Sequence, residues 1–181
     1  MKKVYYLLAF LSINLTALAQ DAYHSQLQTS FQDDFNLPAG QWLFFDDENA
    51  ILNSAGGYGG SFSTLTSTDT DFSRITRGII SREGSNQWDS GWNLRNQQRI
   101  NKDDKVLIVF SIRAVGGKGQ VNIFAEDSNT FAKEAFLTVD ISEEWTAYAI
   151  RFEASKLFNP GSITFGFHLA HQVQTLSLIH I

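Results

Sequence analysis

The chain has 181 residues, no cysteine and a formal net charge of −5 at pH 7. The absence of cysteine excludes disulfides, thiolate metal sites, thiol nucleophiles and a lipid-modified cysteine. The acidic balance argues against nucleic acid and anionic membranes as partners, because both require a basic patch. The length suits a single domain with a core of its own.

The first residues have the three parts of a signal peptide. Met1-Lys2-Lys3 is a basic start, Val4 to Leu11 is an apolar run, and Ala17-Leu18-Ala19 is a small-x-small cleavage site. The apolar run is too short for a membrane span, although an uncleaved anchor is the alternative. We therefore expect residues 1–19 to be removed on export. The mature protein would be secreted or periplasmic, with no membrane span.

The rest of the chain divides into a short polar linker, residues 20–30, and a folded domain, residues 31–181. From Phe31 onward, apolar and aromatic runs alternate with clusters of Gly, Asn, Asp and Ser, which is the pattern of an all-β protein. The Gly-rich run from Asn53 to Ser63 predicts a loop, and such loops often rim a binding site.

Strands are predicted in chain order from these runs. The first half gives strands at 42–46, 51–52, 73–81 and 88–94. The second half gives strands at 105–114, 120–127, 145–153 and 163–170, with a hairpin loop at 116–119. About eight strands at this spacing predict a two-sheet antiparallel jelly-roll sandwich.

Alternation with period two predicts which side chains lie in the core. The strand at 105–114 is apolar on both faces, so we expect it to be central. The residues predicted to be buried between the sheets are Ile108, Phe110, Ile112, Ile123, Ile150, Phe152, Phe165 and Phe167.

The sequence lacks the common catalytic motifs. It has no G-x-S-x-G elbow and no H-E-x-x-H helix. His168 and His171 are three apart, which on a strand sends them to opposite faces and argues against a shared metal. Glycosidases use two carboxylates, but the adjacent acids here are typical of solvated turns. We therefore expect a binding protein rather than an enzyme.

Aromatic residues are the stronger functional signal, because sugar rings stack their apolar faces on aromatic planes. Aromatic residues also fill sandwich cores. We expect Trp92 and Trp145 in the core, and the pattern leaves Trp88 open between core and surface. The aromatic candidates are Trp42, Tyr58, Trp88, Trp92, Trp145 and Tyr148.

Several short motifs, taken in order, resemble a carbohydrate-binding module. They are Gln87-Trp88-Asp89, residues 100–107, residues 110–114, the E-W-x-x-Y run at 144–148, and residues 167–176. Across roughly residues 35–176 the chain resembles the galactose-binding-like jelly rolls of families four, nine and twenty-two. The resemblance implies glycan binding on a concave sheet face or on loops at one edge, and a structural calcium is common in such modules.

The resemblance also implies site residues. By position, Arg113 and Gln174 match polar residues of the ligand-side sheet, and Trp88 with Asp89 matches a W-D motif. Alternation adds the residues on the non-core side of their strands, which are Asn122, Phe124, Glu126 and His168. We expect Arg113, Trp88 and Gln174 on one side of one sheet. The alternative for Arg113 is a pair with Glu126 on a neighbouring strand.

Two departures from the family pattern concern the turn at 102–104 and the end of the chain. The expected K-G-D turn is Lys102-Asp103-Asp104 here, and residues 177–181 lack the glycine and acids that a calcium site draws on. Calcium is therefore not assigned. The chain stops at Ile181 within an apolar run that would lie at a free sheet edge, and we expect a fragment. The run 176–181 also resembles the translated end of a sequencing adapter.

The sequence thus predicts a secreted, non-catalytic module that binds a glycan or polysaccharide. We expect it to be the N-terminal part of a polysaccharide-active enzyme, with a fused catalytic domain. One alternative is a structural or adhesion jelly roll with no sugar site, and an enzyme of unfamiliar type is the third. In place of a fragment, the final strand could close a compact sandwich.

Overall fold

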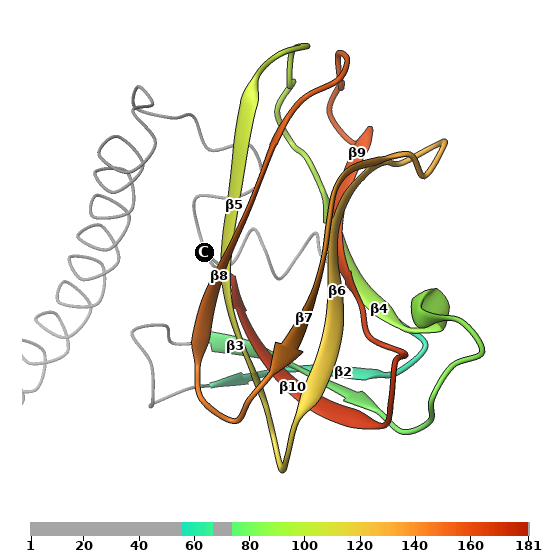
Figure 1. Cartoon of the computed structure of the whole chain (residues 1–181), viewed down its shortest axis with the longest axis vertical. Helices are drawn as coiled ribbons and strands as arrows, with labels where there is room; N and C mark the ends of the chain where they lie inside the picture. The colour runs from blue at the N-terminus through green and yellow to red at the C-terminus, as the bar shows by residue number, and fades with distance from the viewer. Residues whose placement is uncertain (1–55, 67–73, 181) are drawn as a thin grey trace, which may run out of the picture. The chain divides into compact units, whose positions relative to one another are not determined.

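The computed structural model describes residues 56–66 and 74–180, and these residues form a jelly-roll sandwich of two five-stranded antiparallel sheets (Figure 1). Sheet A contains, in spatial order, β1 (Gly56–Tyr58), β4 (Gly91–Arg95), β9 (Ile163–His168), β6 (Gly119–Asp127) and β7 (Lys133–Ile141). Sheet B contains β2 (Ser61–Thr66), β3 (Arg74–Ile80), β10 (Gln174–His180), β5 (Lys105–Ala114) and β8 (Thr146–Glu153). One 3-10 turn, η1 (Gln87–Asp89), precedes β4.

The all-β prediction is confirmed, and the core lies where alternation placed it. Every second side chain of β5 is buried, and Phe110 packs its ring at 4.9 Å from Phe167 and 5.9 Å from Phe165 on the opposite sheet. The other predicted core residues are buried too, except Phe152, which is half-buried on the edge strand β8. Apolar burial of this kind contributes about 25 cal/mol per Å² and is the main stabilising term.

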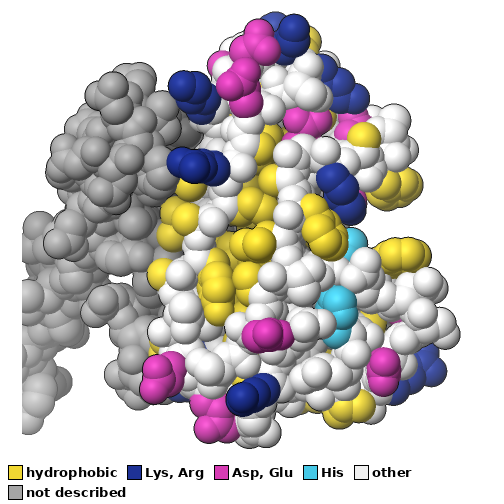
Figure 2. All heavy atoms as spheres, viewed as in Figure 1, with side chains coloured by type: hydrophobic (Ala, Val, Ile, Leu, Met, Phe, Trp, Pro, Cys, Tyr) yellow, Lys and Arg dark blue, Asp and Glu magenta, His cyan; other side chains and the backbone are white. Residues whose placement is uncertain are grey.

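The edge strands leave part of this interior open. Leu137 on β7 pairs with Ile123 and faces inward, yet it is 40% exposed. Figure 2 shows apolar side chains along the seam between β7 and β8, the edge strands of the two sheets on that side.

Several predicted elements are wrong. The segment 53–63 was predicted as a loop, but its described part contains β1 and the start of β2. The glycines at 116–119 do not close a hairpin, because β5 belongs to sheet B and β6 to sheet A. Gly116 and Gly117 have φ of 80° and 136°, and this left-handed backbone turns the chain from one sheet to the other.

Besides β1 and β2, strands β7 and β10 were not predicted. Strand β7 is an edge strand with mostly exposed or half-buried side chains, so its alternation is weak. Strand β10 pairs with both β3 and β5, in the middle of sheet B. The prediction that the last apolar run lies at a free edge is therefore wrong.

The predicted signal peptide, the predicted linker and the strands predicted at 42–46 and 51–52 fall outside the described residues, as does Trp42. Within the described ranges, no helix has the length and apolar character needed to cross a membrane.

Candidate functional site

The outward face of sheet A carries most of the predicted site residues. Val121, Ile123 and Ala125 point into the core, so Asn122, Phe124 and Glu126 on β6 point outward. Strand β9 pairs His168 with Asn122, which places His168 on the same face. The expectation that these four residues share one side is confirmed.

Cross-strand pairing arranges this face in rows. One row runs across all five strands, through Tyr58, Gly91, His168, Asn122 and Thr138. The next row runs through Gly56, Asn93, Gly166, Phe124 and Phe136. In each row, therefore, a glycine is paired with an aromatic residue on a neighbouring strand.

Two close approaches show why glycine is needed there. A Cβ on Gly166 would lie 2.9 Å from Cζ of Phe124, and a Cβ on Gly91 would lie 2.5 Å from Oη of Tyr58. Real Cβ atoms do not approach other atoms so closely, so any side chain at either position would displace the aromatic ring above it.

Trp88, His168 and Phe124 form a stack on this face, called here the aromatic layer. The rings of Phe124 and His168 have centroids 4.3 Å apart, and the rings of His168 and Trp88 have centroids 6.4 Å apart in an edge arrangement. Phe124 is 1% exposed and His168 6%, whereas Trp88 is 54% exposed. Only Trp88 therefore presents its ring to solvent.

Trp88 is held in place by the turn η1, which is tied to sheet A through its neighbour Gln87. The fully buried Asn122 donates from Nδ2 to Oε1 of Gln87 and accepts at Oδ1 from Thr138 Oγ1, at 2.8 Å. The backbone N–H of Ala170 donates to the carbonyl of Gln87 at 3.2 Å. Asn122 thus positions the turn and has no exposed atom for a ligand.

Asp89 of the W-D motif closes the same turn. Its carboxylate accepts the backbone N–H of Asn86 at 2.9 Å and the side-chain amide of Asn86 at 3.4 Å. The carboxylate is exposed, so it stabilises the turn and still borders solvent.

A charged pair lies on the other side of the aromatic layer. Lys133 forms a salt bridge with Glu126, and its Nζ lies 4.6 Å from the centroid of the Phe124 ring. A cation over an aromatic face is attracted by the ring quadrupole. Glu126 is 7% exposed and neutralised by Lys133, so it contributes more to the layer than to a ligand.

Histidine 168 is neutral at pH 7. Burial, followed by the electrostatic effects of Lys133 and His171, lowers its pKa to about 4. Protonation would place a charge inside the stack, which burial disfavours.

Two exposed aromatic residues on this face were not predicted as site residues. Phe136 on β7 is 45% exposed and lies beside Phe124 in the cross-strand row. Tyr58 on β1 is 39% exposed, and burial, followed by the nearby charges of Glu126 and Asp89, raises the pKa of its hydroxyl. Tyr58 was named only as an aromatic candidate, because β1 was not predicted, and Phe136 was missed because β7 was not predicted.

The remaining predicted site residues lie elsewhere. Arg113 is on β5 in sheet B, pairs with Ser177 across the sheet, and holds its guanidinium 4.9 Å from the ring centroid of Trp145. The alternative of an Arg113–Glu126 pair is wrong, because β5 and β6 are in different sheets. Trp145, expected in the core, is half-buried against Arg113, whereas Trp92 is in the core as expected.

Gln174 is a structural link between the two sheets. Its Oε1 accepts the Gln120 N–H at 3.0 Å, and its Nε2 donates to the carbonyls of Gln120, at 3.0 Å, and Leu169, at 2.6 Å. It is 6% exposed and points inward. The prediction that Arg113, Trp88 and Gln174 share one side of one sheet is therefore wrong.

The family resemblance also implies a calcium ion, for which carboxylates are common ligands. Among residues 56–66 and 74–180, no three acidic or histidine side chains gather in a group that could hold a metal ion. The buried Asp127 accepts the N–H groups of Asn129 and Thr130 at 2.8 and 2.7 Å and pairs with Lys156 at 2.5 Å. These donors, Lys156 first, hold its pKa well below the usual range.

Comparison of the sequence with known proteins gives no match to any protein-family model and none to a curated protein. Solved structures do match. A structure described as "CBM4 structure and function" superposes with a TM-score of 0.54 at 14% identity, over 67% of this chain and 75% of that one.

Two further structures match equally well. The CBM22-1 xylan-binding domain of Xyn10C from Paenibacillus barcinonensis has a TM-score of 0.53 at 9% identity, over 70% of this chain and 82% of that one. The N-terminal cellulose-binding domain of β-1,4-glucanase C from Cellulomonas fimi has a TM-score of 0.53 at 14% identity, over 69% and 84%. The chain therefore has the jelly-roll fold of the carbohydrate-binding modules of the CBM4 and CBM22 type.

Proposed function

We propose that the outward face of sheet A binds a glycan and that the described domain is a non-catalytic carbohydrate-binding module. The observation that carries the proposal is the exposed ring of Trp88, which packs against the buried His168 at the surface of the aromatic layer. A large exposed aromatic side chain on a rigid support is typical of a binding contact.

The face supplies both kinds of contact that a sugar needs. Trp88 offers a plane for the apolar side of a sugar ring, and Tyr58 and Phe136 offer further exposed aromatic surface. The half-buried amide of Asn93, in the row between the glycines, can exchange hydrogen bonds with sugar hydroxyls.

The structural or adhesion alternative expects every tryptophan to be buried. Within the described residues Trp92 is buried and Trp145 half-buried, but Trp88 is 54% exposed, and this exposure favours the sugar-binding reading. The acids near the face favour binding over hydrolysis: Glu126 is paired with Lys133, and Asp89 holds its turn.

Export and attachment to an enzyme belong to the same proposal. The N-terminal signal pattern supports secretion, and one of the matching structures is the cellulose-binding domain of a β-1,4-glucanase. An attached module would raise the effective concentration of a catalytic domain at its polymer.

The proposal is tested by binding to soluble xylan, β-glucan, arabinoxylan and galactomannan, measured by affinity electrophoresis and calorimetry. We expect at least one to bind, and Trp88→Ala to weaken that binding at least about tenfold, which is about 1.4 kcal/mol. The matched control is Ile79→Ala, which removes an exposed apolar side chain from sheet B (44% exposed) and should bind as the native protein does. Native-like binding by a folded Trp88→Ala variant would refute the site.

A further inference from the structure

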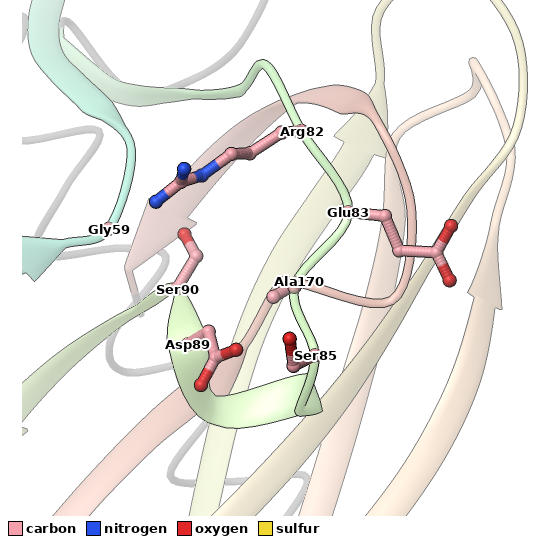
Figure 3. A pocket seen from close by; sticks show the side chains of 8 residues that line it. Gly59, Arg82, Glu83, Ser85, Asp89, Ser90 and Ala170 are labelled. Carbon is pink, nitrogen blue, oxygen red and sulfur yellow. The ribbon is translucent and has the colours of Figure 1, made fainter.

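A polar pocket of about 220 Å³ lies beside the turn η1, and its lining residues are distinct from those of the aromatic layer (Figure 3). The lining residues that matter here are Gly59, Arg82, Ser85, Asp89, Ser90 and Ala170. They come from the β1–β2 turn, the β3–β4 connection and the segment after β9, which are far apart in the sequence.

The walls of the pocket are fixed by backbone contacts. Gly59 has φ of +67°, and a Cβ there would lie 2.0 Å from the carbonyl oxygen of Asp89. The N–H of Gly84 donates to the carbonyl of Ala170 at 3.0 Å, and Ser90 Oγ donates to the carbonyl of Tyr58 at 3.2 Å. The pocket is therefore pre-formed, which lowers the entropy cost of binding.

The side chains around the pocket are suited to hydroxyl groups. In Figure 3 the guanidinium of Arg82 extends along the pocket toward Ser90, while the carboxylate of Glu83 points away. Among the described residues Arg82 has no hydrogen-bond or ion-pair partner, so its donors are available. An arginine only donates, a carboxylate only accepts, and a serine hydroxyl does both, which together match a polyol.

Size and charge narrow the ligand class. The volume is below the roughly 300–1,000 Å³ of pockets that take drug-sized ligands, so the pocket suits one small ring. The positive charge of Arg82 is balanced by the negative charge of Asp89 in the same pocket, and the whole chain is acidic. An anionic ligand therefore has no electrostatic advantage.

We propose that this pocket is a second sugar subsite, which holds one neutral sugar unit, such as a chain end or a branch. The inference rests on the proposed function, because the same glycan would lie on Trp88. Asp89 and Ser90 follow Trp88 directly in the chain, so the same turn supplies the exposed ring and part of the pocket wall.

The test is a titration of the ¹⁵N-labelled protein with D-glucose, D-xylose, L-arabinose or D-galactose, followed by NMR. At least one sugar should shift the backbone amides of Gly59, Gly84 and Ser90 in a saturable way. Arg82→Ala should weaken this binding at least about fivefold, which is about 1 kcal/mol. Arg99→Ala, another exposed arginine with no described partner, is the matched control and should bind like the native protein.

A second variant tests whether the sugar occupies the volume of the pocket, rather than whether it needs the charge of Arg82. Ser85 is exposed, so Ser85→Phe fills the pocket without disturbing the core and should abolish the shifts. The subsite is refuted if none of the four sugars shifts these amides, if a folded Ser85→Phe protein still shows the shifts, or if D-glucuronate shifts them and no neutral sugar does.

The two proposals fail separately. Polysaccharide binding that depends on Trp88, with no monosaccharide shifts at the pocket, would keep the proposed function and remove the subsite. Monosaccharide shifts at the pocket, with polysaccharide binding unaffected by Trp88→Ala, would keep the pocket and remove the role of the aromatic layer.

Discussion

Asn122 connects the interior of sheet A to the position of Trp88. It is fully buried and uses both ends of its amide, toward Gln87 and toward Thr138. A buried amide with satisfied partners specifies one arrangement, because any other arrangement leaves a polar group unpaired.

We predict that Asn122→Ala lowers the free energy of unfolding by about 1–3 kcal/mol, because Gln87 loses a buried partner. Glycan affinity should also fall, although Trp88 itself is unchanged, because η1 is no longer tied to the sheet. Urea unfolding and calorimetric titration measure the two effects. Thr138→Ala removes only the exposed end of the network and should have the smaller effect on both. Unchanged affinity in the Asn122→Ala variant would contradict the positioning role.

Histidine 168 should make the domain less stable in acid. Its pKa is about 4 in the folded state, below the usual value of about 6.5 in the unfolded chain. Between these values the unfolded state binds more protons, so stability is constant above about pH 6.5 and falls as the pH approaches 4.

Thermal melts of the native protein and of His168→Gln between pH 7 and pH 4 measure how much of the acid sensitivity comes from His168. The variant should lose less of its melting temperature over the same range, because glutamine does not titrate. Equal losses in the two proteins would show that other groups, such as acids that lose their ion pairs, cause the acid sensitivity.

The residues of the site show what alternation can and cannot predict. Period two correctly placed Asn122, Phe124, Glu126 and His168 on one face, because it depends only on local backbone geometry. It could not show that all four are buried under neighbouring side chains, since burial depends on strands far away in the sequence.

At the level of elements, strands β6 and β10 are linked between the sheets by one side chain, Gln174. We predict that Gln174→Ala lowers the free energy of unfolding by about 1–3 kcal/mol, because it leaves groups of Gln120 and Leu169 unpaired. Glycan affinity should stay near the native value, since Gln174 is buried and points inward. Denaturant unfolding and affinity electrophoresis decide between this structural role and the ligand contact that the family resemblance implies.

The strands that were predicted and those that were missed differ in physical character. Strands β5, β6, β8 and β9 have strong alternation, because at least one face of each is packed against the other sheet. Strands β1, β2 and β7 are held mainly by backbone pairing with a neighbour, and their side chains carry little pattern. Edge strands of this kind have no local sequence signal of comparable strength.

At the level of the whole molecule, the sandwich has two outward faces with different chemistry. The face of sheet A bears the aromatic layer, and sheet B bears Arg113 stacked on Trp145. The sequence could not separate them, because alternation gives the face of a strand but not its sheet, and the 115–118 connection changes sheets.

We predict that Arg113→Ala leaves glycan affinity within about twofold of the native value, because distant sites behave independently. Its melting temperature should fall, since Trp145 loses the guanidinium packed against its ring. Affinity electrophoresis of the Arg113→Ala and Trp88→Ala variants, run side by side, compares their losses of glycan affinity. A loss as large as that of Trp88→Ala would move the site to sheet B.

The position of β10 in sheet B also determines how the chain can fold. Strand β3 pairs with β2 on one side and with β10 on the other. Its residue Ile80 pairs with Gln174, and most of the described chain lies between the two. Closing so long a loop costs conformational entropy before the strand pairing contributes any stabilising free energy. Domains dominated by such contacts therefore fold in milliseconds to seconds. On the ribosome, the edge of β3 that pairs with β10 therefore stays unpaired until β10 emerges. During that interval the nascent chain is most exposed to wrong pairing with another copy of itself.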